Sequence, residues 1–173
     1  MSKVSRYIST EWDKIECPHS MWIPDYEGIE RPKHITPSEF FFHSPLHPLI
    51  ASVFDAAREK WEAPILVTSG VRCWAYQEVL RQKGLRTAEV SPHIYGTALD
   101  IMPYARENER NLPGDNEKDL AIIIHEIDAN IRIYVARYAF KFIHLDCAYL
   151  LPDPLPDGRA KPESWKEGVR DFP

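Results

Sequence analysis

Residues 91–102 read Ser-Pro-His-Ile-Tyr-Gly-Thr-Ala-Leu-Asp-Ile-Met, and this stretch is the main determinant of the fold that we predict. His93 offers an imidazole and Asp100 a carboxylate, two ligand types that Zn²⁺ accepts. Pro92 and Gly96 disfavour a helix between the two ligands, so we expect a loop that feeds a strand. The stretch therefore predicts half of a metal site.

The strand expected over residues 97–102 has two different faces, because alternate side chains of a strand point in opposite directions. Leu99 and Ile101 share the face that can enter the core. Asp100 lies on the other face and is therefore expected to face a cleft.

A second strand-like run, residues 142–146, supplies the third ligand. Its alternation places His144 and Asp146 on one face and Ile143 and Leu145 on the other. Three protein ligands leave a fourth tetrahedral position for water, which is the arrangement of a catalytic zinc rather than a structural one. The predicted ligand set is His93, Asp100 and His144.

The order of these residues resembles a known family. The string Ser91-x-His93-x-x-Gly96-x-Ala98-x-Asp100, followed downstream by His144-x-Asp146, is similar to the zinc D-alanyl-D-alanine carboxypeptidase and endolysin peptidase family, which shares its fold with the hedgehog signalling domain. The other matching segments are Thr36–Phe40, the helix-like run Leu46–Trp61, and the run Ile65–Arg72 that ends in Ser-Gly-x-Arg. The resemblance covers roughly residues 35–148.

The resemblance implies a zinc metallopeptidase that hydrolyses peptidoglycan stem peptides, either as a carboxypeptidase or as an endolysin-type endopeptidase. Arg72 matches the family arginine that engages substrate, and a guanidinium can clamp a carboxylate in a bidentate manner. Its alternative role is an ordinary ion pair. Ser91 is placed beside the zinc-binding histidine, where its hydroxyl could bond substrate, orient a ligand or only cap a turn.

The chain departs from the family pattern at the proton carrier. Many active members place an Asp or Glu three residues before the last zinc-binding histidine, whereas this chain has Lys141. Asp146 is the nearest substitute as a catalytic base, although it could instead fix the tautomer of His144. Glu89 and Glu126 are further carboxylates without positional support. The departure favours the alternative function, a non-catalytic zinc-binding module of the same fold that binds cell wall or a protein partner; a metal-free scaffold is a third, weaker reading.

Composition limits the class of protein. The 173 residues are 44% hydrophobic and 12% aromatic, as in a globular domain, and the formal net charge of −5 argues against nucleic-acid binding. Three cysteines without metal-type spacing argue against a disulfide framework. The N-terminus lacks the apolar region of a secretory signal, and no run is long enough to span a membrane. We expect a monomer that first resides in the cytoplasm and reaches the cell wall if released, for example by a phage holin.

The predicted organisation is one α+β domain with helices packed on a small, mainly antiparallel sheet. An irregular N-terminal extension covers residues 1–34, the zinc peptidase-like domain residues 35–150, and a Pro-rich C-terminal tail residues 151–173. We expect this tail to lie on the surface or to be partly disordered. The expected helices lie at 46–61, 74–83 and 120–127, the last preceded by the cap candidates Asp115 and Asn116, and a further short helix is expected to start at the capping box Thr36–Glu39. The expected strands lie at 65–67, 97–102, 132–136 and 142–147, and the last two are expected to form an antiparallel pair with a short connection.

Overall fold

The computed structural model describes residues 46–72, 74–85, 87–104, 115–136 and 142–166. Outside the described residues lie the predicted extension at 1–34, the predicted helix start at Thr36–Glu39, and Lys141. None of the described helices combines the length and the apolar composition needed to cross a lipid bilayer.

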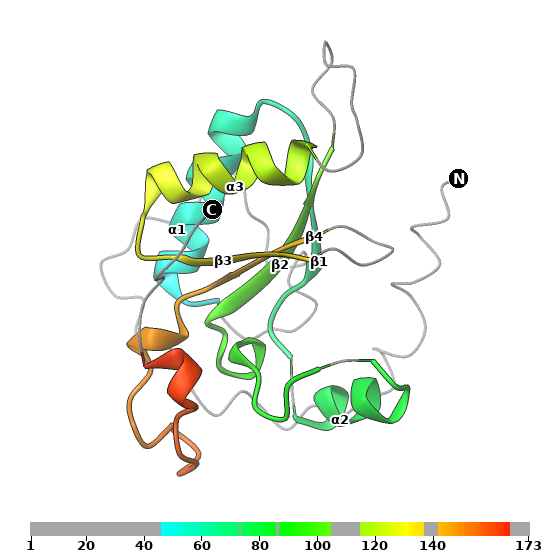
Figure 1. Cartoon of the computed structure of the whole chain (residues 1–173), viewed down its shortest axis with the longest axis vertical. Helices are drawn as coiled ribbons and strands as arrows, with labels where there is room; N and C mark the ends of the chain where they lie inside the picture. The colour runs from blue at the N-terminus through cyan, green and yellow to red at the C-terminus, as the bar shows by residue number, and fades with distance from the viewer. Residues whose placement is uncertain (1–45, 73, 86, 105–114, 137–141, 167–173) are drawn as a thin grey trace.

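A four-stranded antiparallel sheet forms the centre of the structure (Figure 1). The strand order is β1-β2-β4-β3, so β2 and β4 are the two inner strands. Their bounds are Ile65–Ser69 for β1, Ala98–Pro103 for β2, Arg132–Ala136 for β3 and Phe142–Asp146 for β4. The predicted antiparallel pairing of β3 with β4 is confirmed. The inner pair matters most for the site, because both predicted ligand-bearing strands lie there.

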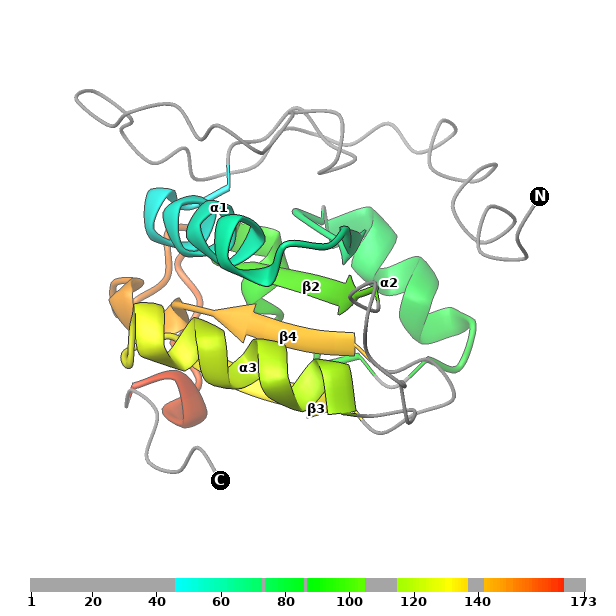
Figure 2. The same cartoon turned by 90° about the horizontal axis from the view of Figure 1, so that it is seen from above.

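Two helices, α1 (Pro48–Trp61) and α3 (Asp115–Ile127), contact each other and cover one face of the sheet (Figure 2). The third helix, α2 (Trp74–Gln82), lies apart from them toward one end of the sheet. The predicted α+β class, with helices packed on a small antiparallel sheet, is confirmed. The helix predicted over 120–127 begins at Asp115, one of its two predicted cap residues.

The core lies between the sheet and the α1–α3 layer. Helical periodicity places Ile50, Phe54 and Trp61 of α1 on its buried side, which is the expected behaviour of an amphipathic helix. The strands contribute their inward-facing residues to the same cluster: Leu99, Ile101, Ile143 and Leu145, all fully buried. Burial of this apolar surface stabilises the strands that carry the polar site on their opposite face.

The segment that carries His93 is a short 3-10 turn, Pro92–Tyr95, rather than an open loop. Pro92 suits the first position of such a turn because its fixed backbone angle matches the helical range. Gly96 ends the turn with a φ of 68°, a left-handed conformation that glycine adopts without steric cost. The chain then reverses directly into β2, so the turn and the strand hold their two ligands close together.

The segment after residue 150 corrects the prediction of a surface or disordered tail. Leu151, Leu155 and Trp165 are buried and form a second apolar cluster with Ile94 and Tyr95 of the 3-10 turn. The prolines interrupt any regular period, so the sequence pattern did not reveal these buried positions. The described part of this segment, residues 151–166, therefore supports the turn that carries His93.

Lys161 stabilises the same segment through hydrogen bonds to its backbone. Its Nζ donates to the carbonyl oxygens of Tyr149 at 2.7 Å and Leu151 at 2.6 Å. Burial lowers the pKa of this lysine. A buried ammonium group is tolerated only when its donors are satisfied, and here backbone carbonyls provide the partners.

Candidate metal centre

The inner strand pair brings two predicted ligands face to face. In the β2–β4 register, Asp100 lies directly opposite His144. Asp100 Oδ1 is 2.8 Å from His144 Nδ1 and 3.2 Å from His93 Nε2. One ligand atom from each of the three residues can be chosen so that all lie within 4.8 Å of one another. The predicted set is therefore assembled from three segments of the chain, a 3-10 turn and two strands.

The hydrogen bonds of His93 define which of its nitrogens faces the cluster. Its Nδ1 lies 2.8 Å from the carbonyl oxygen of Gly70, which can only accept, so Nδ1 carries the proton. Burial and the nearby Arg72 cation lower the pKa of His93 to about 4, which keeps the ring neutral at pH 7. Nε2 then presents a lone pair toward Asp100 Oδ1. Two acceptor atoms 3.2 Å apart are favourable only when a cation or a proton lies between them.

His144 has two acidic neighbours. Its Nδ1 faces Asp100, and its Nε2 lies 3.2 Å from Oδ2 of Asp146. Burial acts to lower the pKa of His144, but hydrogen bonds to the two carboxylates outweigh it and raise the pKa to about 9. In this arrangement the positive charge that Asp100 and Asp146 require is supplied by a proton on His144. A metal ion at Nδ1 could supply the same charge while Nε2–H continued to donate to Asp146.

Asp100 is buried and remains ionised. Burial acts to raise its pKa, but the adjacent imidazole of His93 and the positive charge and hydrogen bond of His144 hold the pKa well below the usual range for a carboxyl group. Its second oxygen, Oδ2, accepts a hydrogen bond of 2.9 Å from Nη2 of Arg72. One carboxylate oxygen is thus held by an arginine while the other is presented to the two histidines.

Arg72 lies beside the ligands, as expected from the Ser-Gly-x-Arg segment, but its contacts are internal. Besides Asp100, its Nε donates to Ser69 Oγ at 2.8 Å, and its Nη1 lies 3.5 Å from Gln77 Oε1. A register shift between Val67 and Ser69 in the β1–β2 pairing accompanies the end of β1 at this point. The structure thus shows the ion-pair alternative for Arg72, and substrate binding by this residue stays a prediction.

The carboxylate of Asp146 contacts one member of the cluster, His144, and otherwise contacts neighbouring protein groups. Its Oδ2 faces His144 Nε2, and its Oδ1 accepts from the backbone N–H of Ala148 at 3.0 Å. Nε of Arg132, the residue paired with Asp146 across the β3–β4 register, lies 3.5 Å from the same Oδ1. Both oxygens therefore have partners, and this geometry suits a residue that orients His144.

The remaining predicted site residues lie in different places. Ser91 is buried directly before the 3-10 turn, and its side chain makes no capping hydrogen bond there. Glu89 is exposed and borders a separate pocket near α2. Glu126 is exposed on α3, which packs against the opposite face of the sheet. Neither glutamate belongs to the cluster of His93, Asp100 and His144.

Sequence reasoning missed the contacts of Arg132 and Gly70. The sequence predicts an antiparallel pair of strands at 132–136 and 142–147, but the residue types alone do not fix the register that sets Arg132 opposite Asp146. The partner of His93 at Gly70 is a backbone carbonyl, which every residue has, so no residue type in the sequence could have identified it. A pattern of residue types can thus identify ligands, whereas their backbone partners require the fold.

Comparison with known proteins agrees with the resemblance in the motifs. A sequence model of the peptidase M15 family matches residues 26–146, which is more than half of the chain. The chain belongs to the peptidase M15 family. The match contains every residue of the metal-ligand cluster and both inner strands.

Structural comparison gives a more distant similarity for this M15 family member. It resembles the crystal structure of the Serratia marcescens L-Ala D-Glu endopeptidase ChiX with a TM-score of 0.46 and 19% sequence identity. The similarity covers 58% of this chain and 79% of that chain. No curated protein sequence matches the chain.

Proposed function

We propose that the protein is a zinc-dependent peptidase that hydrolyses peptide bonds in peptidoglycan stem peptides. The observation that carries this proposal is the geometry at Asp100 Oδ1, which lies within 3.2 Å of one nitrogen from each of two histidines. His93 Nδ1 donates its proton to the Gly70 carbonyl, so His93 Nε2 and Asp100 Oδ1 face each other with lone pairs, and this arrangement suits a cation. Membership of the peptidase M15 family supports the reaction class.

His93 through Nε2, His144 through Nδ1 and Asp100 through Oδ1 would hold the metal. Two imidazoles and one carboxylate suit zinc and leave room for water or substrate. When bound, zinc would polarise a scissile carbonyl and lower the pKa of a coordinated water to about 7. The chain positions these ligands through the Gly70 carbonyl, Arg72 and Asp146, each of which contacts one ligand side chain.

The role of Asp146 in this proposal is orientation of His144. A general base must reach the proton that it removes. Both oxygens of Asp146 are instead directed to Ala148, Arg132 and the far nitrogen of His144. Arg72 keeps Asp100 in position and has a further expected role in holding a substrate carboxylate, and Ser91 is expected beside substrate.

The experiment that tests this proposal is a product assay. Purified protein with one equivalent of zinc is incubated with muropeptides, and released D-Ala or cleaved stems are identified by mass spectrometry. Release of D-Ala would assign carboxypeptidase activity, and cleavage within the stem would assign endopeptidase activity. Absence of product from every stem, with zinc shown to be bound, would contradict the proposal.

A second candidate function is a non-catalytic zinc module that binds cell wall or a protein partner. It is favoured by Lys141, which stands where the family has a carboxylate, and by Asp146, whose two oxygens are already bonded within the protein. Zinc-dependent binding to peptidoglycan without any product would distinguish this module from the enzyme.

A further inference from the structure

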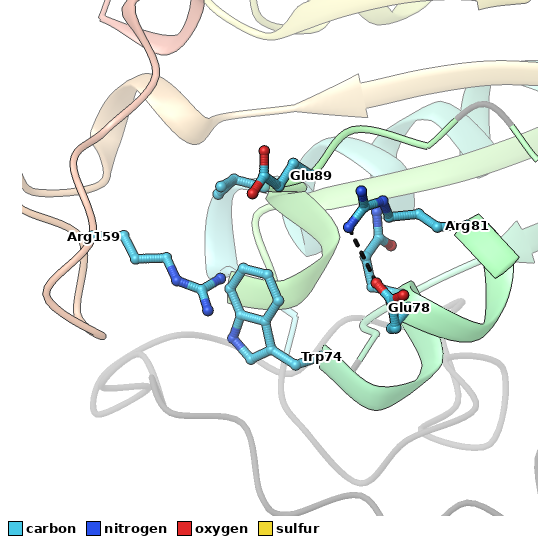
Figure 3. Close-up of a pocket in the computed structure, with 7 residues that line it drawn as sticks. Trp74, Glu78, Arg81, Glu89 and Arg159 are labelled. Atoms are coloured by element: carbon cyan, nitrogen blue, oxygen red, sulfur yellow. Dashed lines mark hydrogen bonds and ion pairs between the residues drawn. The ribbon is translucent and has the colours of Figure 1, made fainter.

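A pocket of about 390 Å³ lies between α2 and the segment after residue 150. This volume is within the range of sites that bind small molecules. We call it the α2 pocket, and its charged or aromatic lining residues are Trp74, Glu78, Arg81, Glu89 and Arg159 (Figure 3). It is distinct from the metal-ligand cluster, none of whose members lines it.

The α2 pocket adjoins the metal-ligand cluster through two side chains. Gln77 lines the pocket, and its Oε1 lies 3.5 Å from Nη1 of Arg72, whose Nη2 bonds Asp100. Gln77 is itself held by a 2.8 Å bond from Nε2 to the carbonyl oxygen of Ala88. An extended peptide advances roughly 3.3–3.6 Å per residue, so a substrate bound at the cluster needs few further residues to reach the pocket.

The charges that line the α2 pocket are of two kinds. Arg81 and Glu78 form an ion pair of 3.1 Å with each other on one side of the pocket, and so neutralise one another (Figure 3). Glu89 is exposed, and no hydrogen bond or ion pair holds its carboxylate within the described part of the chain. This leaves one carboxylate available to a ligand.

Arg159 supplies the corresponding cation. Its guanidinium lies over the Trp74 ring at 3.5 Å from the centroid, which fixes its plane while its N–H edges stay open. Its nearest acidic group is Asp157 at 3.7 Å, whose Oδ2 already accepts a 2.9 Å bond from Tyr95. The side chain of Arg159 is 49% exposed, so its charge is accessible to a ligand.

We propose that the α2 pocket binds a stem-peptide residue whose side chain ends in both an ammonium and a carboxylate group. Arg159 receives the carboxylate, Glu89 receives the ammonium, and Trp74 supports the guanidinium. This inference rests on the proposed function, because it names the feature of the peptidoglycan peptide that the peptidase selects. A residue ending in an ammonium alone would bring no carboxylate to Arg159 and would bind less well.

The test compares two tripeptides on the full chain with zinc: L-Ala-γ-D-Glu-meso-diaminopimelate, whose last side chain ends in both groups, and L-Ala-γ-D-Glu-L-Lys, whose last side chain ends in an ammonium only. The ratio of Kd values is measured by calorimetry when no product forms, and the ratio of kcat/KM when product forms. We expect the diaminopimelate peptide to be preferred at least about tenfold, since hydrogen bonds to charged groups discriminate by this order.

Two variants assign the preference to the pocket. Arg159→Gln should reduce the preference to about twofold or less by weakening only the diaminopimelate peptide, whereas Glu89→Gln should weaken both peptides. Lys83→Gln is the matched control, because Lys83 is an exposed cation just after α2 that does not line the pocket, and it should retain the preference. Equal binding of both tripeptides by the natural chain, or an equal loss of both in Arg159→Gln, would overturn the inference. Cleavage without preference would leave the proposed function intact, while preference in binding without cleavage would contradict only the proposed function.

Discussion

The two faces of the inner strand pair differ sharply, although the same two strands supply both faces with alternate residues. On one face, Leu99 and Leu145 are fully buried in the apolar core beneath α1 and α3. On the other face, Asp100, His144 and Asp146 form a connected set of hydrogen bonds. The same two strands therefore carry a buried polar cluster, which is costly to desolvate, and are held rigid by the apolar packing on their other face. Substitutions on the two faces should therefore have separable effects.

The largest expected effect belongs to the polar face. His144→Ala removes one of three proposed protein ligands, so zinc affinity should fall by orders of magnitude and peptidase activity should be lost. The core on the opposite face is unchanged, so circular dichroism should show a folded protein. Zinc content is measured by elemental analysis after dialysis against a competing chelator. His125→Ala, on α3, is the control and should retain zinc; a full equivalent bound by His144→Ala at natural affinity would show that β4 does not belong to the site.

The apolar face should give the opposite result. Leu145→Ala is expected to lower the free energy of unfolding by about 2–5 kcal/mol, because it removes a fully buried side chain and leaves a cavity. Urea unfolding with chelator present measures this without the contribution of bound metal. Ile122→Ala, at an exposed position of α3, should change the free energy by less than about 1 kcal/mol. An equally small effect of Leu145→Ala would contradict the conclusion that the apolar face stabilises the fold.

A smaller effect is expected from Asp146→Asn, which tests whether Asp146 orients His144 or acts as a base. If Asp146 orients His144, the substitution should weaken zinc binding by about 10–100-fold without abolishing it. Zinc affinity is measured by competition with a chelating dye, and turnover is then measured at saturating zinc. Unchanged zinc affinity with a turnover loss beyond about 100-fold would instead assign Asp146 as the base. Arg132→Gln should act in the same direction as Asp146→Asn, and more weakly.

Much of this contrast could be predicted from the sequence. Period-2 alternation in residues 97–102 and 142–146 correctly assigned the core and polar faces, because burial on one side imposes that period. The motif spacing identified three residues that the structure brings together: His93, Asp100 and His144. Local patterns succeeded wherever one strand or one turn determines the environment of a side chain.

Other features depended on contacts between distant segments. The Arg72–Asp100 pair joins the segment after β1 to β2, close to a register shift that no local pattern encodes. Burial of Leu155 and Trp165 depends on the apolar surface that Tyr95 presents, so a Pro-rich segment without periodicity was wrongly expected on the surface. The α2 pocket likewise combines α2 with Arg159, residues that only the folded chain brings together.

The smallest expected effect concerns Cys147, the residue after Asp146, which alternates back into the apolar core. Burial, with the nearby Asp146 charge adding to it, raises the pKa of this thiol far above its usual range. Only the thiolate is reactive, so iodoacetamide at pH 8 should leave Cys147 unmodified in the folded protein and alkylate it in urea, as measured by mass spectrometry of its tryptic peptide. The thiol of the unfolded chain ionises at about pH 8.5, so the contribution of the buried neutral thiol to stability is present below that pH and is lost as the pH rises above it. Alkylation of the native protein at the rate of the unfolded chain would show that the end of β4 does not alternate between the two faces as described.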